Sequence, residues 1–557
     1  MTTLASGTDT LTRDALTVLQ PGFTGTTAPD WLLRRLGEGL ASVGLFGRNI
    51  ASPGQLAALT AQLRTERDDV LVAIDEEGGD VTRLEVRSGS SFPGNHALGA
   101  VDDVELTREV AHELGRRLAA CGVNLNWAPS ADVNSNPSNP VIGVRSFGAD
   151  TGLAARHTAA YVTGLQSAGV AACTKHFPGH GDTAVDSHHA LPRIDVPAEV
   201  LADRELAPFR AAIAAGTRAV MSAHILVPAL DPDRPATLSR RILTGLLRGE
   251  LGYDGLIVTD GMEMRAIAGT YGIERGSVLA IAAGADAICV GGGLADDATV
   301  LRLRDALVAA VRAGELPEER LADAADRVRA LAAWAGSAGR SPGDAPGGEI
   351  GLEAARRALT VIPAPGLGSP GAFTPLTEPP YVAALTPVAN IAVGDETPWG
   401  IAAELVHLLP GTVTGSFSAG DAGNAGNAGN AGDAGDDGSA GDDGNAGDDG
   451  NAGDAGNAGD AGGAAGGKKS EAGESAGRAA LQAAGPRRIV AVVRDEHRHP
   501  WMAAALDTLL AARPDTIVVE MGVPQAAPRG ALHIATHGAA RVCARAAAEV
   551  IAGISER

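Results

Sequence analysis

Asp186 and His188 are the residues whose types and spacing most directly suggest proton transfer. They stand two positions apart, so in an extended segment their side chains share one face. A carboxylate so placed orients an imidazole and stabilises its protonated form, which suits His188 as general acid/base. A plain hydrogen bond within a loop is the alternative. His176 and His180 could suggest a metal site, but the Pro-Gly step between them breaks the helix that their i,i+4 spacing needs, and we expect no metal.

Asp260 is the candidate nucleophile, because it directly follows a short apolar run at 256–259. A buried strand there would deliver a single carboxylate to the end of the strand, where it can attack a bound substrate. A cap on the following helix is the alternative for an isolated Asp in this position. The polar residues that follow the other apolar runs favour the nucleophile.

Residues 75–83 combine a carboxylate at the end of an apolar run, a Gly-Gly pair and a basic residue. Asp75 and Arg83 suit a site that holds sugar hydroxyls, because charge-assisted hydrogen bonds are the strong ones. Taken alone, this motif is weak.

The elements that would position these residues are short apolar runs that alternate with helical patterns up to about Trp334. The helical patterns include 106–118 and 155–165, and the runs are rich in Val, Ile and Leu. Such alternation predicts a (β/α)8 TIM-like barrel, with a doubly wound sheet as the alternative. The eight predicted strands are 16–18, 43–46, 70–74, 123–127, 170–174, 219–221, 256–259 and 287–290.

Unusual polar residues recur where these predicted strands end. In a barrel such positions share one rim, the carboxyl-terminal face where active sites lie. A random scatter of polar residues would not select the same end of successive strands. The residues are Asp75, Asp132, Arg145, Lys175, His176, His224 and Asp260.

The remainder of the chain predicts a smaller second domain. We expect the catalytic barrel at 1–335, a Gly-, Ser- and Pro-rich linker at 336–350 and a smaller α/β domain at 351–557. That domain shows a helical pattern at 352–358, with apolar runs at 359–362, 489–493 and 516–519.

A low-complexity insertion interrupts this second domain at about 418–475. Its centre, 421–462, repeats Asn-Ala-Gly, Asp-Ala-Gly and Asp-Asp-Gly. The repeat lacks the proline of collagen and the apolar residue of calcium-binding nonapeptides. Low hydrophobicity and dense acid therefore favour a solvated, disordered segment.

The composition disfavours some classes of binding partner. The chain has 557 residues, a net charge of −22 and only four cysteines, which are scattered and form no CxxC pair. An acidic chain disfavours nucleic acid and anionic membranes. We see neither a signal peptide nor a run of about 18 apolar residues, so we expect a cytoplasmic protein without a membrane partner.

The motifs resemble glycoside hydrolase family 3, in its β-N-acetylglucosaminidase branch. The resemblance rests on 74–79 with Arg83, on the Lys-His-Phe-Pro-Gly-His-Gly-Asp-Thr run at 175–183 with 186–188, and on 258–264. Residues 46–50 and 143–148 fit as well. It covers residues 15–340 in order and spacing, and is weaker from 350 to 557.

The resemblance implies a role for each matching residue. Asp260 matches the nucleophile, and His188 matches the acid/base that Asp186 orients. The matches to positions that hold the terminal N-acetylglucosamine are Asp75, Arg83, Arg145, Lys175 and His176.

The reaction implied is a double displacement through a glycosyl-enzyme, without cofactor. We expect a retaining exo-glycosidase that releases terminal β-linked N-acetylglucosamine from muropeptide or chitin-derived oligosaccharides. Enzyme alternatives are a phosphorylase, with phosphate as acceptor, and a dual-specificity β-glucosidase. A sugar-binding protein is the non-enzyme alternative, which the presence of both Asp260 and His188 disfavours.

Overall fold

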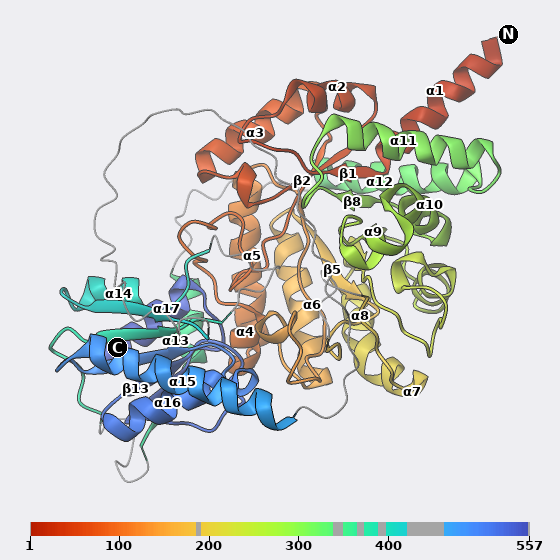
Figure 1. Ribbon diagram of the computed structural model, residues 1–557. Helices are drawn as coiled ribbons and strands as arrows, with labels where there is room; N and C mark the ends of the chain where they lie inside the picture. Colours follow the sequence, from red (N-terminus) through yellow and green to blue (C-terminus); the bar gives the residue numbers. More distant parts are fainter. Residues whose placement is uncertain are drawn as a thin grey trace, which may run out of the picture.

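The computed structural model describes residues 2–184, 191–337, 349–364, 373–387, 397–419 and 462–554. Two groups of elements follow one another along the chain (Figure 1). The first unit comprises α1 to α12 with β1 to β8, and the second unit comprises α13 to α17 with β9 to β14.

The first unit is built on parallel strands. β2 to β7 form a six-stranded sheet in chain order, β1 pairs with β8, and a bridge between Val258 and Ala287 connects β7 to β8. Among the described residues no ladder joins β1 to β2, so the sheet is a parallel half-barrel that the bridge links to the β1–β8 pair. The strands are β1 (Leu19–Pro21), β2 (Ser42–Leu45), β3 (Leu71–Ile74), β4 (Leu125–Asn126), β5 (Ala171–Phe177), β6 (Ala219–Ser222), β7 (Leu256–Thr259) and β8 (Ile288–Val290).

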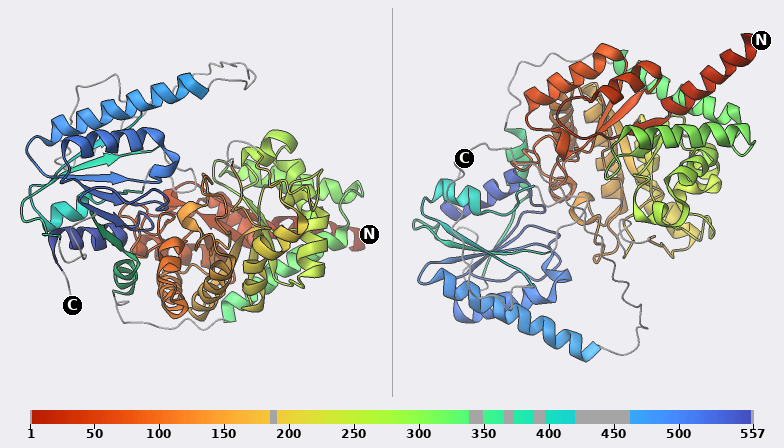
Figure 2. Two further views of the ribbon diagram at one scale, coloured as in Figure 1. Left: turned by 90° about the horizontal axis from the view of Figure 1, so that it is seen from below. Right: turned by 45° about the horizontal axis from the view of Figure 1, so that its top comes forward.

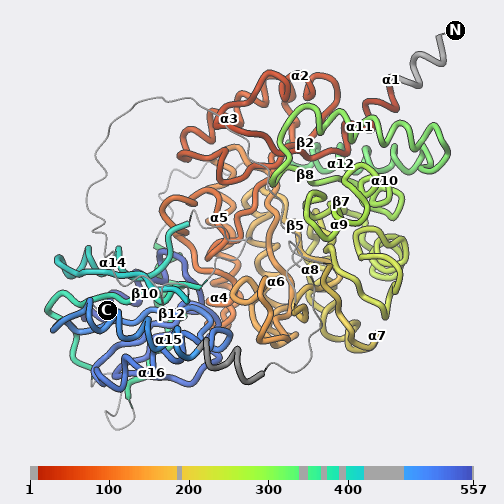
Figure 3. The backbone as a smooth tube through the Cα atoms, viewed as in Figure 1, coloured from red at the N-terminus to blue at the C-terminus, as the bar shows by residue number. Residues whose placement is uncertain are grey.

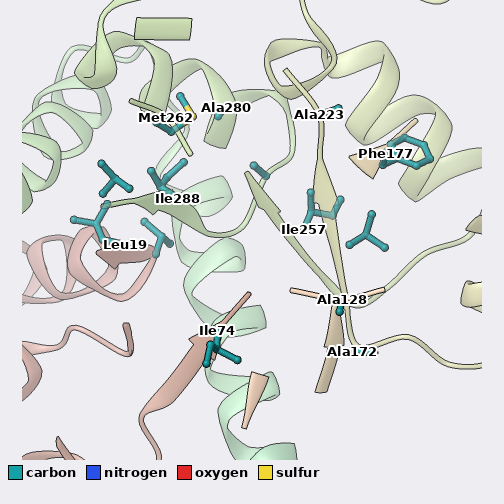
Figure 4. Packing of buried hydrophobic residues seen from close by; sticks show 14 of the residues in the cluster. Leu19, Ile74, Ala128, Ala172, Phe177, Ala223, Ile257, Met262, Ala280 and Ile288 are labelled. Atoms are coloured by element: carbon teal, nitrogen blue, oxygen red, sulfur yellow. The ribbon is translucent and has the colours of Figure 1, made fainter. Parts of the chain in front are cut away.

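These strands are buried at every position, as expected for parallel strands covered on both faces. Their outward side chains pack under the surrounding helices, and Figure 4 shows Ile257 and Ile288 in this layer. Their inward side chains, including Leu71, Cys173 and Val258, form a second cluster that α12 closes with Val328 and Leu331.

Helices follow most of the strands, and several begin at a capping side chain. Asp103 accepts hydrogen bonds from the first amides of α5, and Asp150 does so for α6. The helices of the first unit are α1 (Thr2–Thr17), α2 (Asp30–Glu38), α3 (Pro53–Glu66), α4 (Asn95–Val101), α5 (Val104–Ala120), α6 (Thr151–Ser167), α7 (Ala198–Val200), α8 (Leu206–Ala214), α9 (Arg265–Tyr271), α10 (Ile273–Ala283), α11 (Asp297–Arg312) and α12 (Glu318–Ser337).

The first predicted strand was wrong. Residues 16 and 17 end α1, and the strand β1 begins at Leu19, which pairs with Ile288. Leu11 and Ala15 are buried one helical turn apart, so the apolar run at 16–18 continues a helical face. The other seven predicted strands and the helical patterns at 106–118 and 155–165 coincide with observed elements.

The second unit carries its own sheet, in the order β11-β10-β12-β13-β14-β9, with only β9 antiparallel. Helices α14 and α17 cover one face, and α15 and α16 cover the other (Figure 2). Its elements are α13 (Ile350–Ala358), β9 (Thr360–Pro363), β10 (Tyr381–Leu385), α14 (Ala402–Leu408), β11 (Val413–Phe417), α15 (Gly462–Ala484), β12 (Ile489–Val493), α16 (Pro500–Ala512), β13 (Ile517–Glu520), β14 (Leu532–Ala535) and α17 (Arg541–Ala552).

The predicted insertion at 418–475 reaches too far, because α15 begins at Gly462. Its small residues permit close packing on α16. A Cβ at Gly473 would lie 2.2 Å from the Trp501 carbonyl oxygen, and one at Gly477 would lie 2.7 Å from Cβ of Thr508. In this stretch Gly473 is buried against α16, whereas Ser470, Glu471 and Glu474 are exposed. Residues 420–461, which hold most of the repeat, lie outside the described residues.

Figure 3 follows the chain from α1, at one end of the first unit, to α15 and α16 in the second. None of the helices in the described ranges is long and apolar enough to cross a membrane.

Candidate active site

Glu77, in the loop after β3, is the centre of a buried charge cluster. Its carboxylate accepts two hydrogen bonds from Arg145, 3.0 Å from Nε and 2.7 Å from Nη2. Lys175 Nζ lies 2.7 Å from Glu77 Oε1 and 2.5 Å from Asp75 Oδ1. Arg83 Nη2 lies 3.6 Å from Asp75 Oδ2. Two residues predicted to hold sugar, Arg145 and Lys175, therefore bind Glu77, which was not predicted as a site residue, and Asp75 and Arg83 join the cluster through Lys175.

These contacts determine the charge states of Glu77 and Lys175. Burial would raise the pKa of Glu77, but the charges of Arg145 and Lys175 outweigh burial and hold that pKa well below its usual range. Burial would lower the pKa of Lys175, but Asp75 and Glu77 raise it above its ordinary value. Glu77 and Lys175 are therefore both ionised around neutral pH.

His176 is fixed by Asp132, which follows β4. His176 Nδ1 lies 2.7 Å from Asp132 Oδ2, and the amides of His176 and His180 donate to Oδ1. Burial would raise the pKa of Asp132, but the charge of His176 lowers it to about 2. A carboxylate accepts only, so Nδ1 carries a proton and donates. His176 Nε2 faces Arg145 Nη2 at 3.4 Å, which joins His176 to the cluster.

His180 turns away from His176. Its Nδ1 lies 2.8 Å from Thr183 Oγ1, and burial lowers its pKa to about 4. The two rings are 5.9 Å apart and nearly perpendicular. Within the described ranges, no three His, Cys, Asp or Glu side chains come together in a way that could hold a metal.

Asp260 follows β7 directly and is half-buried. Its amide donates to the Ser222 carbonyl at 3.2 Å, and its Oδ1 accepts the Gly261 amide at 2.8 Å. His224, after β6, donates from Nε2 to the Gly261 carbonyl at 3.0 Å. The backbone that carries Asp260 is therefore held on both sides, and His224 supports the loop after β7.

Asp186 and His188 lie outside the described residues, as does the whole stretch 185–190. The chain leading to them is anchored. Asn139 Nδ2 donates to the carbonyls of His180 and Gly181, at 2.9 and 3.0 Å. The loop after β5 is therefore fixed to the loop after β4.

Sequence reasoning missed Glu77 and Glu263. Glu263 Oε1 accepts the amides of Gly291, at 3.0 Å, and Gly292 just after β8. Arg48 donates to the carbonyls of the same two glycines. Glu77 lies within the predicted sugar-binding motif, directly before the Gly-Gly pair. A buried carboxylate there needs a cationic partner, and this requirement could have identified it.

The second unit contacts the same rim. Asp80, in the loop after β3, pairs with Arg494 and accepts the Ala539 amide at 2.7 Å. His497 lies 2.8 Å from the Pro137 carbonyl in the loop after β4. The loops that carry Asp75 and Arg145 therefore pack against loops that follow β12 and β14.

The fold and the site together define a parallel α/β protein that gathers carboxylates and cations at its strand ends. Residues 29–331 match the family model described as "Glycosyl hydrolase family 3 N terminal domain". The chain belongs to glycoside hydrolase family 3.

Named relatives agree with this membership. "Beta-hexosaminidase A" of Pseudoalteromonas piscicida is 36% identical over 312 residues, which span 52% of this chain and 52% of that protein. The match therefore covers only about half of that relative's length. "Beta-hexosaminidase" of Bordetella avium (strain 197N) is 37% identical over 264 residues, which cover 45% of this chain and 74% of the relative.

Among solved structures, a glycoside hydrolase family 3 beta-N-acetylglucosaminidase from Paenibacillus sp. str. FPU-7 is 34% identical with a TM-score of 0.78. That match covers 98% of this chain and 96% of the Paenibacillus chain, and so includes the second unit. A beta-N-acetylhexosaminidase from Beutenbergia cavernae is 33% identical with a TM-score of 0.53, over 58% of this chain and 98% of the other.

Proposed function

We propose that the protein is a retaining exo-β-N-acetylglucosaminidase that acts on muropeptide or chitin-derived oligosaccharides. The observation that carries the proposal is the ion-pair cluster of Asp75, Glu77, Lys175 and Arg145 at the same strand ends as Asp260. Such a cluster suits a neutral polyol, since paired charges offer strong hydrogen bonds without net charge. The names of the Pseudoalteromonas and Paenibacillus relatives support the same substrate class.

In this proposal the sugar-binding residues are Asp75, Arg83, Arg145, Lys175 and His176. The catalytic residues are Asp260, His188 and Asp186. We assign them to a (β/α)8 barrel at 1–335, joined by a linker at 336–350 to a second domain at 351–557.

The proposed reaction has two displacements. The Asp260 carboxylate attacks the anomeric carbon and forms a glycosyl ester, while His188 donates its proton to the departing oxygen. His188, now neutral, takes a proton from water as the water oxygen attacks the same carbon and releases Asp260. Two inversions leave the configuration retained. Asp186 stabilises the protonated imidazole in the first step.

Water is the preferred acceptor over phosphate. A neutral imidazole would not repel phosphate, whereas an anionic Glu in the same role would. However, Lys175 and Arg145 are already neutralised by Asp75 and Glu77. Their charges therefore add little attraction for an anion.

Turnover of aryl β-N-acetylglucosaminide and aryl β-glucoside by the wild type tests the substrate assignment. The glucosaminide should be strongly preferred. Asp260→Asn should remove almost all activity while the circular dichroism spectrum and melting temperature stay close to wild type. Near-normal turnover by folded Asp260→Asn would overturn the nucleophile.

The sugar product formed in phosphate buffer shows whether water or phosphate is the acceptor. Free N-acetylglucosamine at a rate independent of phosphate supports hydrolysis. N-acetylglucosamine 1-phosphate, with turnover that rises with phosphate concentration, would instead establish a phosphorylase.

A further inference from the structure

Asp80 belongs to the proposed sugar-binding loop at 75–83, yet its carboxylate is bound by the second unit. Its side chain is 1% exposed and pairs with Arg494, which follows β12 and is 14% exposed. The other oxygen, Oδ1, accepts the amide of Ala539, after β14, at 2.7 Å. Both oxygens of a buried carboxylate in the first unit are thus satisfied by residues more than 400 positions further along the chain.

The loop is held at its other end by the cluster. Lys175 binds Asp75, and Arg83 lies 3.6 Å from the same carboxylate. Between these ends the Glu77 amide donates to the Val81 carbonyl at 3.0 Å, which closes the loop on itself. Asp80 and Arg83 are only three positions apart. A displacement of the Asp80 backbone would therefore also displace Arg83.

An unpaired carboxylate cannot stay buried without a large cost in free energy. If Arg494 lost its charge, Asp80 would either take up a proton or move toward solvent, and in both cases the loop would lose the ion pair that holds it to the second unit.

We propose that Arg494 is a positioning residue for the sugar-binding loop, acting through Asp80 on Arg83 and Asp75. This inference rests on the proposed function, in which these two residues hold the terminal sugar. Arg494 itself does not touch the substrate. A purely structural clamp between the units is the competing explanation.

A second pair across the units provides a matched control. Arg357 on α13 lies 2.8 Å from Asp103, the N-cap of α5, and both side chains are substantially exposed. This pair joins the same two units through the same residue types. It makes no contact with the loop at 75–83, so its removal should leave substrate binding unchanged.

The experiment compares Arg494→Gln with Arg357→Gln in the full chain. Both are assayed for kcat and KM on aryl β-N-acetylglucosaminide and for melting temperature. Arg494→Gln should raise KM about tenfold with kcat changed less than about twofold, because the loop binds ground state and transition state alike. Arg357→Gln should leave both constants at wild-type values. Arg494→Lys, which keeps the charge, should restore part of the KM.

Asp80→Asn is the second variant, because the amide oxygen can still accept the Ala539 amide while the charge is lost. Both variants remove the ion pair between the loop and Arg494, so Asp80→Asn should reproduce the KM effect if Arg494→Gln does not fold. A wild-type KM in folded Arg494→Gln or Asp80→Asn, with only a lower melting temperature, would overturn positioning and leave a structural clamp.

A wild type that fails to cleave the substrate overturns the proposed function without deciding the role of Arg494. Calorimetric titration with N-acetylglucosamine then decides it. A dissociation constant raised about tenfold in Arg494→Gln but not in Arg357→Gln supports positioning, and equal constants overturn it.

Discussion

The Glu77 carboxylate and the Arg145 guanidinium form a two-bond ion pair in which the side chains are only 3% and 5% exposed. The same carboxylate binds Lys175, so one acid orders two cations, one in the loop after β4 and one near the end of strand β5. Removing one partner of such a pair leaves uncompensated charge in the interior.

Glu77→Gln should therefore destabilise the protein by about 3–5 kcal/mol and lower kcat/KM at least about tenfold. Urea unfolding and turnover of the aryl substrate measure the two effects. The control is Glu113→Gln on α5, which also removes a carboxylate that binds two arginines, Arg116 and Arg117. This change should leave activity unaltered. Equal activity losses in both variants would argue against a specific role for Glu77.

His188→Ala should slow substrates with poor leaving groups far more than activated aryl substrates, because only the former need a proton donor. The measurement is kcat/KM across leaving groups of different acidity. His112→Ala, on the outer surface of α5, should give the wild-type dependence. If His188→Ala lowers all rates equally, the histidine is structural.

The stacked rings of His96 and His537 at the junction of the units predict acid sensitivity. Burial lowers the pKa of each to about 4, with the neighbouring imidazole also lowering that of His96 and Asp495 opposing it. The unfolded chain takes up these protons near pH 6.5, so stability is complete above that pH and is lost as pH falls toward 4.

Buried Glu76 acts oppositely, because burial raises its pKa to about 7, so the measured quantity is the difference between variant and parent. His96→Gln should reduce the fall in melting temperature between pH 7 and 4.5 by about 2–4 °C. Exposed His407→Gln on α14 should not change it. An unaltered pH dependence in His96→Gln would show that the pair does not titrate with unfolding.

Deleting the repeat at 421–462 should change melting temperature and turnover little, since a segment so poor in apolar residues cannot contribute a core. Gly477→Leu is the contrasting variant. Its Cβ would lie 2.9 Å from the Ala505 carbonyl and should separate α15 from α16, which lowers the melting temperature. A large loss of stability in the deletion would show that the repeat has a structural role.

Much of the fold could be predicted from the sequence, because buried parallel strands consist of uninterrupted apolar runs. Residues 489–493 were predicted as such a run and form β12 without change of bounds. The first strand failed for the same reason, since a buried helix end gives the same pattern as a buried strand over three residues. The end of the insertion was predicted too late, at 475 rather than before Gly462, because Gly and Ala are typical both of solvated repeats and of closely packed helices.

The sequence by itself determined the family and the candidate residues, because strand ends, glycines and charged side chains occur there in a specific order. It could not determine which charges pair. Glu77 meets residues 68 and 98 positions away, and Asp80 meets Arg494 at a separation of 414. Such pairing depends on burial and on the docking of two sheets, and only the tertiary structure brings those groups into one low-dielectric site.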